Sequence, residues 1–145
     1  MILNENITLK NICYNYPKAS KTSLKNINFS IQACSTVGLV GATGSGKTTT
    51  VDIILGLLEP QKGRLEVDGK KIDKNNLRSW QQTIGYVPQQ IFLSDDTIAA
   101  NIAFGTDPKD VNQEAVKYAS KIANLHEFVT NELPLQYKTK IGENG

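Results

Sequence analysis

The chain has 145 residues, of which 39% are hydrophobic, and its 16 basic and 14 acidic side chains give a net charge of +2. This length and apolar content are enough for one domain with a buried core, and so balanced a charge gives no argument for a nucleic-acid or anionic-membrane partner. The longest apolar run, residues 51–58, is far shorter than the roughly 20 residues of a membrane-spanning helix. The two cysteines, Cys13 and Cys34, are widely spaced and support neither a zinc motif nor a disulfide framework.

No secretion signal is recognisable at the N-terminus, so a cytoplasmic location is expected. Two strands are predicted in the first 32 residues. Residues 7–16 are strand-like, and the apolar phase switches between Leu9 and Ile12, which predicts a bulge. Residues 24–32 alternate between apolar and polar side chains, as in an antiparallel strand with one solvated face. Residues 17–21 are expected to form the connecting turn.

Residues 41–48, Gly-Ala-Thr-Gly-Ser-Gly-Lys-Thr, fit G-x-x-x-x-G-K-[ST], the loop that wraps the phosphates of a nucleoside triphosphate. Its glycines let the backbone curl and turn consecutive N–H groups toward the β-phosphate. Lys47 is expected to reach the β and γ oxygens, the Thr48 hydroxyl to bind Mg²⁺, and Thr49 to reach the α-phosphate. The predicted nucleotide-binding residues here are Gly41, Thr43, Gly44, Ser45, Gly46, Lys47, Thr48 and Thr49.

The flanks of this loop agree with the prediction. Residues 36–40 read as a short buried strand, and apolar side chains recur with helical spacing from Val51 to Leu58, in a helix that begins near Gly46. Strand, loop and helix is the order that phosphate binding requires, with the positive end of the helix aimed at the anion. The alternative is a glycine-rich turn without a ligand, which this context disfavours.

A hairpin is predicted after the loop's helix, with strands over 64–67 and 70–72 on either side of Asp68-Gly69, a strong turn signal. The remaining predicted elements are a helix over 75–82, a buried strand over 83–88, a loop over 89–92, a helix over 97–104 and a longer helix capped by residues 107–110. The longer helix is expected to carry its apolar positions on one face, namely Val111, Ala115, Ala119 and Ile122.

The order of these elements resembles the nucleotide-binding domains of ABC-type ATPases over nearly the whole chain. The phosphate loop at 40–48 follows an aromatic run at 13–17 that is similar to the family's adenine-stacking segment. Residues 86–89, Tyr-Val-Pro-Gln, resemble the family's glutamine loop. Residues 96–105 are similar to the segment that faces the transmembrane coupling helices in exporter-type members, and residues 139–145 to the loop before their signature sequence.

The resemblance implies an α/β fold. Its parts are a RecA-like P-loop NTPase core with an antiparallel β subdomain over residues 1–90, and the start of a helical subdomain over residues 91–145, truncated before the signature motif. The family's signature, its strand ending in Asp-Glu and its switch histidine are not in this sequence. The stretch is therefore expected to bind ATP without efficient hydrolysis. The single histidine, His126, is interpreted as a surface or capping residue.

The resemblance also implies roles for individual residues, with ATP and Mg²⁺ as cofactors. Tyr16 matches the adenine-stacking aromatic, and Gln89 matches the glutamine that senses Mg²⁺ and the γ-phosphate. The implied catalytic residues are Lys47 and Gln89, and the implied metal ligands are Thr48 and Gln89. The alternatives are a half-buried strand aromatic for Tyr16, a polar loop residue for Gln89, and a core plug rather than a partner contact for Phe92.

For the intact parent, the resemblance implies an exporter or flippase in which ATP binding and hydrolysis drive transport across a membrane. The implied partners are a transmembrane domain and a second nucleotide-binding domain, at the cytoplasmic face, with no nucleic acid. One alternative is a soluble ABC ATPase acting on DNA or ribosomes, which needs a basic face or a coiled-coil insertion that the sequence does not show. The other is a P-loop kinase or GTPase, but the sequence has no Asn-Lys-x-Asp and only two arginines, Arg64 and Arg78.

Two positions depart from the family's pattern. Cys34 stands where a glycine usually makes the turn into the loop's strand, so either Cys34 tolerates that turn or the turn differs. Asn144 replaces an arginine in the loop before the signature, although Glu143 is retained. Trp80 is assigned to packing.

Overall fold

A computed structural model of the chain describes residues 2–17 and 22–142, and the chain divides into two compact units, Met1–Tyr86 and Val87–Gly145. Within the described ranges, every helix is too short or too polar to cross a bilayer. The subdomain limits expected from the sequence, 1–90 and 91–145, stay a prediction.

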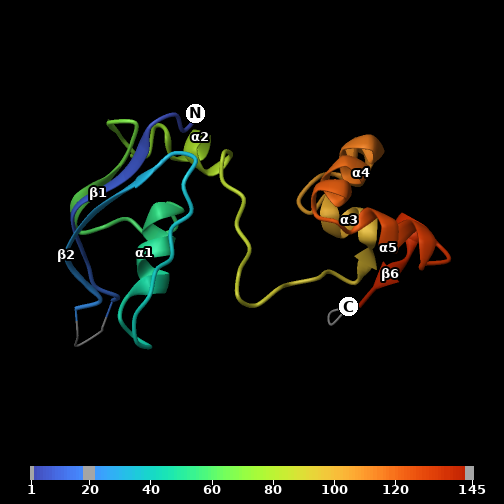
Figure 1. Cartoon of the computed structure of the whole chain (residues 1–145), viewed down its shortest axis with the longest axis horizontal. Coiled ribbons are helices and arrows are strands. Elements are labelled where there is room, and N and C mark those ends of the chain that lie inside the picture. The colour runs from blue at the N-terminus through green and yellow to red at the C-terminus, as the bar shows by residue number, and fades with distance from the viewer. Residues whose placement is uncertain (1, 18–21, 143–145) are drawn as a thin grey trace. The chain divides into compact units, whose positions relative to one another are not determined.

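The first unit contains a four-stranded antiparallel sheet in the order β2-β1-β3-β4 (Figure 1). Its strands are β1 (Asn6–Tyr14), β2 (Leu24–Gln32), β3 (Lys62–Val67) and β4 (Lys70–Lys71). The register of β1 against β2 shifts between Leu9 and Ile12, and Asn11 there has a φ of 52°, which confirms the predicted bulge. The hairpin turn at Asp68 and Gly69 is also confirmed, with φ values of 50° and 73°.

Two carboxylates tie this sheet together. Asp68 accepts hydrogen bonds from the backbone N–H groups of Asn4, Glu5 and Asn6, at 2.8, 2.8 and 2.9 Å, and these bonds, that from Asn4 above all, hold the pKa of Asp68 below its ordinary value. Glu66 is buried on β3 between the Lys10 ammonium and the Arg64 guanidinium, each 2.6 Å away. Hydrogen bonds from Lys10 and then Arg64 lower the pKa of Glu66, against the opposing effect of its burial.

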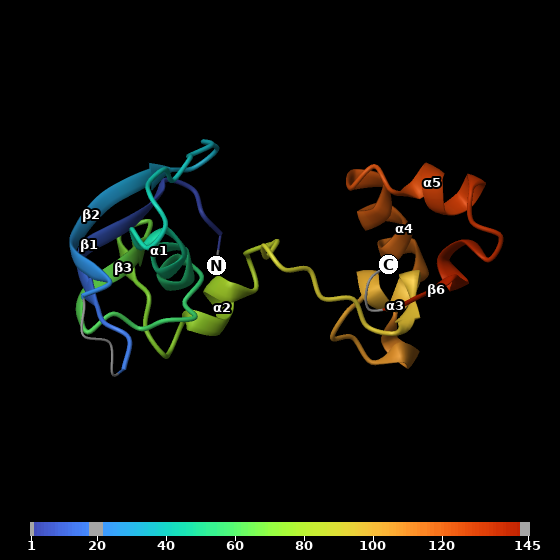
Figure 2. The same ribbon diagram turned by 90° about the horizontal axis from the view of Figure 1, so that it is seen from below.

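Helix α1 (Lys47–Ile54) lies against one face of the sheet, as Figures 1 and 2 both show. The short helix α2 (Leu77–Gln81) adds Trp80, which is 3% exposed and donates its indole N–H to the carbonyl of Ile54 at 2.7 Å. The packing role predicted for Trp80 is confirmed. The core that these elements enclose consists of Leu9, Ile12, Tyr14, Leu24, Ile53, Leu65, Val67 and Trp80.

The two other strands predicted around the phosphate loop are wrong for this structure. Residues 36–40 and 83–88 are irregular, and Val40 and Val87 are 95% and 83% exposed. Strands that read as continuous apolar runs belong to parallel sheets, in which hydrogen-bonded neighbours lie on both edges and both faces are covered. Among the described residues no strand pairs with either segment, so neither becomes part of a sheet.

The second unit contains a short antiparallel strand pair, helices and two short 3₁₀ turns. Its elements are β5 (Asp96–Thr97), α3 (Ile98–Ile102), η1 (Pro108–Asp110), α4 (Gln113–Ile122), α5 (His126–Asn131), η2 (Gln136–Lys138) and β6 (Lys140–Ile141). The Thr97 hydroxyl caps α3 by accepting from the N–H of Ala100 at 3.1 Å, and the Asn112 side chain caps α4. The core of this unit is Ile98, Val116, Val129 and Tyr137.

The apolar face predicted for the longer helix is wrong at three of its four positions; the fourth, Val111, is half-buried and packs against the core of this unit. The buried residues of α4 are Val116 and Ser120, whereas Ala115, Ala119 and Ile122 are exposed. Val116 packs in the same core as Ile98 and Val129, so contacts with α3 and α5 decide which stripe is buried. The buried stripe is therefore displaced by one residue from the predicted one, and apolar spacing alone did not reveal it.

Cys34, which stands where the family usually has a glycine, lies in the turn after β2. This residue has a φ of 57°, in the left-handed region, so the turn has the conformation that favours glycine and the cysteine adopts it. Residues 18–21 of the predicted connecting turn, and residues 143–145 with Glu143 and Asn144, lie outside the described residues. His126 begins α5 and is half-buried, and its Nδ1 lies 2.8 Å from the Tyr137 hydroxyl.

Candidate nucleotide-binding site

The phosphate loop is fixed against the start of β2 through Gly46. Gly46 precedes the first residue of α1 and has a φ of 93°. A Cβ atom at this position would lie 2.6 Å from Cδ2 of Leu24 and 3.0 Å from the Ser23 carbonyl oxygen. Only glycine fits, both for its conformation and for the space it leaves. The Thr50 hydroxyl further locks this corner by donating to the Gly46 carbonyl at 2.9 Å.

A cavity of about 300 Å³ opens between this loop and the end of β1. Its lining residues are Tyr16, Thr22, Ser23, Gly44, Gly46, Lys47, Thr48 and Thr49. The structure thus brings together six of the residues predicted to bind nucleotide. Gly41, Thr43 and Ser45 belong to the same loop but do not line the cavity. Thr22 and Ser23 were missed, because no sequence motif marks them and only the packing of Gly46 brings them to the loop.

Lys47 gives the cavity its positive charge. Its ammonium donates to the carbonyls of Gly41 and Ala42, at 2.7 and 3.0 Å, and so lies across the curl of the loop. The first turn of α1 has no acidic side chain that would neutralise it. The positive end of the α1 dipole adds to this charge. A polyphosphate oxygen is a stronger acceptor for this ammonium than a neutral carbonyl, so the site is suited to an anion.

Three threonines follow Lys47 and have different environments. Thr48 is exposed and lines the cavity, whereas Thr49 and Thr50 are each only 6% exposed. Thr48 therefore has a hydroxyl that a cation in the cavity can reach. The Thr49 hydroxyl lies 3.3 Å from the hydroxyl of Tyr16.

Tyr16 stands beyond the last residue of β1, so it is not a strand aromatic. The residue is 41% exposed and lines the cavity, and its ring meets the ring of the buried Tyr14 edge to face at a centroid distance of 5.1 Å. An aromatic face at the rim of a phosphate-binding cavity is a surface on which a base can stack.

Gln89 belongs to the second unit, in an exposed segment outside helix and strand, and its role stays a prediction. Phe92 of the same segment is 72% exposed and packs edge to face with Phe104 at 6.1 Å. The interpretation of Phe92 as a core plug is therefore wrong for the described residues.

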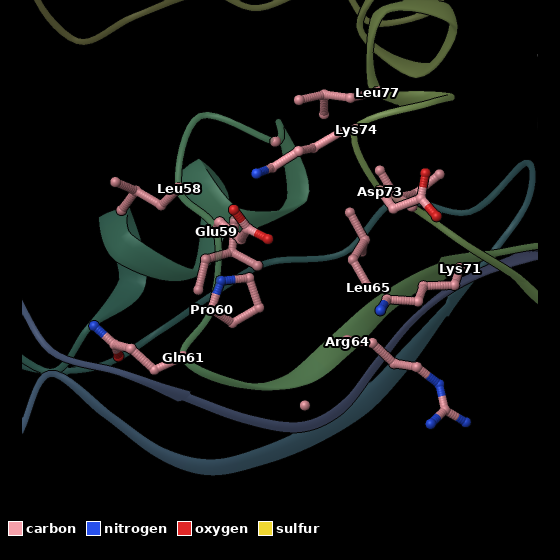
Figure 3. Close-up of a pocket in the computed structure, with 14 residues that line it drawn as sticks. Leu58, Glu59, Pro60, Gln61, Arg64, Leu65, Lys71, Asp73, Lys74 and Leu77 are labelled. Carbon is pink, nitrogen blue, oxygen red and sulfur yellow. The ribbon is translucent and has the colours of Figure 1, made fainter.

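A second cavity of the first unit, about 320 Å³ in volume, lies between the end of α1, the β3–β4 hairpin and α2 (Figure 3). Its charged lining residues are Glu59, Arg64, Lys71, Asp73 and Lys74. Figure 3 shows the Arg64 guanidinium turned away from the other lining side chains. Because carboxylates share this cavity and no residue of the phosphate loop reaches it, its chemistry does not suit a triphosphate.

Comparisons with known proteins agree on one family. Residues 24–143 match the family model described as ABC transporter. An uncharacterized ABC transporter ATP-binding protein of Bacillus subtilis is 34% identical over 143 residues, which cover 99% of this chain and 24% of the relative. An ATP-dependent lipid A-core flippase of Chromobacterium violaceum is 40% identical over 134 residues, covering 92% of this chain and 22% of the relative.

A solved structure of a bacterial Atm1-family ABC exporter with ATP bound superposes with a TM-score of 0.85 and 31% sequence identity, over 99% of this chain and 24% of the exporter chain. This likeness confirms the predicted P-loop NTPase fold with an antiparallel β subdomain. The chain spans about a quarter of the length of these proteins. With the family model matching most of its length, the chain belongs to the ABC transporter family.

Proposed function

We propose that this chain is the ATP-binding part of an ABC transporter of exporter or flippase type, in which ATP binding and hydrolysis drive transport across a membrane. The observation that carries the proposal is the cavity at the phosphate loop, where the Lys47 ammonium and the start of α1 supply positive charge. The relatives support the exporter class, since they include a flippase and an exporter with ATP bound.

Each end of the nucleotide has a group to receive it. The triphosphate lies on the loop amides and Lys47, the α-phosphate is reached by Thr49, and the base stacks on Tyr16. The exposed Thr48 hydroxyl beside Lys47 suits Mg²⁺, which uses few protein ligands and takes phosphate oxygens and waters for the rest. Bound Mg²⁺ would neutralise charge on the β and γ oxygens. Gln89 is proposed as the second Mg²⁺ ligand and the sensor of the γ-phosphate.

Hydrolysis needs more than these residues. The 145 residues contain no Leu-Ser-Gly-Gly-Gln sequence and no apolar strand ending in Asp-Glu, so no general base is identified in them. We propose that the complete site forms with a second nucleotide-binding domain and that a transmembrane domain is the other partner, at the cytoplasmic face of a membrane. The 145 residues alone are then expected to bind ATP and to hydrolyse it weakly or not at all.

Equilibrium titration with MgATP tests the proposal. Lys47→Ala removes the ammonium that is proposed to contact the β and γ oxygens, and is expected to weaken binding roughly 100-fold. Lys74→Ala removes a lysine from the second cavity and serves as the matched control, with affinity expected within about twofold of the unsubstituted chain. Equal binding by Lys47→Ala and the unsubstituted chain would contradict the assignment of the phosphate loop.

The same titration with GTP separates ATPases from GTPases. The chain lacks the Asn-Lys-x-Asp motif that recognises guanine. We therefore expect ATP to bind more tightly than GTP, and a clear preference for GTP would contradict the proposed nucleotide.

A further inference from the structure

We propose that Thr49 is a positioning residue for Tyr16, and that their two hydroxyls link the base end of the nucleotide cavity to its phosphate end. The inference rests on the proposed ATP-binding function. It assigns to Thr49 a task beyond contact with the α-phosphate, and to the Tyr16 hydroxyl a task beyond stacking on the base.

The Tyr16 ring is held at two points. Its hydroxyl oxygen lies 3.3 Å from Oγ1 of Thr49, which is the third residue of α1 and is 6% exposed. Its ring rests edge to face on Tyr14, which is 8% exposed and belongs to the core of the sheet. One contact ties the ring to the helix that follows the phosphate loop, and the other ties it to β1. The ring is thus oriented before any nucleotide arrives, although the residue as a whole is 41% exposed and leaves room for a base.

The donor and acceptor capacities of the two hydroxyls give the contact a direction. Each hydroxyl has one hydrogen to donate and can accept as well. A phosphate oxygen only accepts, so the Thr49 hydroxyl donates its hydrogen to the phosphate and accepts from Tyr16. The hydrogen bonds then run from the Tyr16 hydroxyl to Thr49 Oγ1 and on to the α-phosphate.

Preorganisation explains why this contact affects affinity. An exposed tyrosine that must be immobilised when the base stacks on it loses rotamer freedom in the complex. The contact with Thr49 restricts the ring beforehand, so part of that loss has already occurred. Inorganic triphosphate has no base and gains nothing from an ordered ring.

The experiment measures the affinity of the full chain for MgATP and for magnesium triphosphate. Tyr16→Phe keeps the ring and removes its hydroxyl, and is expected to weaken ATP about threefold to tenfold while leaving triphosphate within about twofold. Tyr118→Phe removes the hydroxyl of an exposed tyrosine on α4 and is expected to change neither affinity. Thr49→Ser retains a hydroxyl at residue 49 and is therefore expected to retain most of the ATP affinity that Thr49→Val loses.

A double-substitution cycle then tests whether the hydroxyls of Tyr16 and Thr49 act through each other. Thr49→Val removes the hydroxyl that accepts from Tyr16, so adding Tyr16→Phe to Thr49→Val is expected to weaken ATP by less than a further twofold. Additive effects, or a Tyr16→Phe variant that binds ATP as tightly as the unsubstituted chain, would overturn the positioning role and leave ATP binding intact. If the unsubstituted chain itself does not bind MgATP, the proposed function fails and this inference fails with it. Should Thr49→Val not fold, the Tyr16→Phe and Thr49→Ser results still decide the question.

Discussion

The antiparallel sheet and the two irregular segments at 36–40 and 83–88 contain similar apolar side chains in opposite environments. Leu9 and Ile12 of β1 are 1% and 0% exposed, whereas Val40 and Val87 are 95% and 83% exposed. Strand β1 is hydrogen-bonded on both edges, to β2 and to β3. The irregular segments have no paired neighbour among the described residues. A segment of strand-favouring side chains therefore forms a strand only where its backbone N–H and C=O groups find hydrogen-bond partners on a neighbouring strand.

Truncating a core side chain is expected to show this difference most strongly. Leu9→Ala removes a fully buried side chain and is expected to lower the free energy of unfolding by about 2–5 kcal/mol. Val40→Ala changes an exposed one and is expected to lower it by less than about 0.5 kcal/mol. Denaturant unfolding followed by the fluorescence of Trp80, the only tryptophan and part of the same core, measures both. Equal losses would mean that the two regions are packed alike.

Two glycines, one in the sheet and one in an irregular segment, differ in what surrounds their backbone. Gly63 of β3 has a φ of 84°, and a Cβ there would press on the carbonyl oxygens of Lys10 and Asn11. Gly63→Ala is expected to lower the free energy of unfolding by about 1–3 kcal/mol. Gly38 has open space around it and no left-handed φ, so Gly38→Ala is expected to change the stability by less than about 1 kcal/mol. The same unfolding experiment compares them, and a larger loss for Gly38→Ala would contradict this account.

Acid is expected to weaken the sheet through Glu66 and Asp68. This effect is expected to be smaller than those of the core truncation and the glycine substitution. Hydrogen bonds from Lys10 and Arg64 lower the pKa of Glu66, and those from the N–H groups of residues 4–6 lower the pKa of Asp68. The unfolded chain therefore takes up protons first as the pH falls. The stabilisation that these two ionised carboxylates give the folded chain is fully present above the ordinary carboxyl pKa of about 4. It is lost as the pH falls through the lowered pKa values of the folded state.

The variant Glu66→Gln checks this pH dependence. Urea unfolding at pH 6 and at pH 3 is expected to show a smaller pH-dependent loss of stability in Glu66→Gln than in the unsubstituted chain. Glu132→Gln, which replaces an exposed carboxylate of the second unit, is the matched control and is expected to show the full loss. If Glu66→Gln loses as much stability between pH 6 and pH 3 as the unsubstituted chain does, Glu66 is not a cause of the acid sensitivity.

Local patterns predicted the parts of the molecule that depend on neighbours in sequence. The alternation of residues 24–32, the phase switch before Ile12 and the Asp68-Gly69 turn each led to the observed element. The phosphate loop was predicted because its motif requires a particular backbone and a particular charge. Gly46 confirms the conformational requirement with its φ of 93°.

Features that depend on packing between distant segments were not predicted. Thr22 and Ser23 line the cavity only because Gly46 packs against Ser23 and Leu24. The contact between Tyr16 and Thr49 joins residues 33 positions apart, and no spacing in the sequence indicates it. The buried face of α4 follows from its contacts with Ile98 and Val129 rather than from its own apolar positions. Residues 36–40 have the composition of a strand but lack the partners that would make them one.

ATP binding at the phosphate loop can be observed directly by titrating the isotopically labelled chain with MgATP and following its backbone amide resonances by NMR. We expect the largest shifts at residues 41–50, Tyr16 and Ser23, around the cavity at the phosphate loop. We expect small shifts at Arg64, Lys71 and Lys74, around the second cavity. Largest shifts at the second cavity, or none at residues 41–50, would contradict the claim that this loop binds ATP.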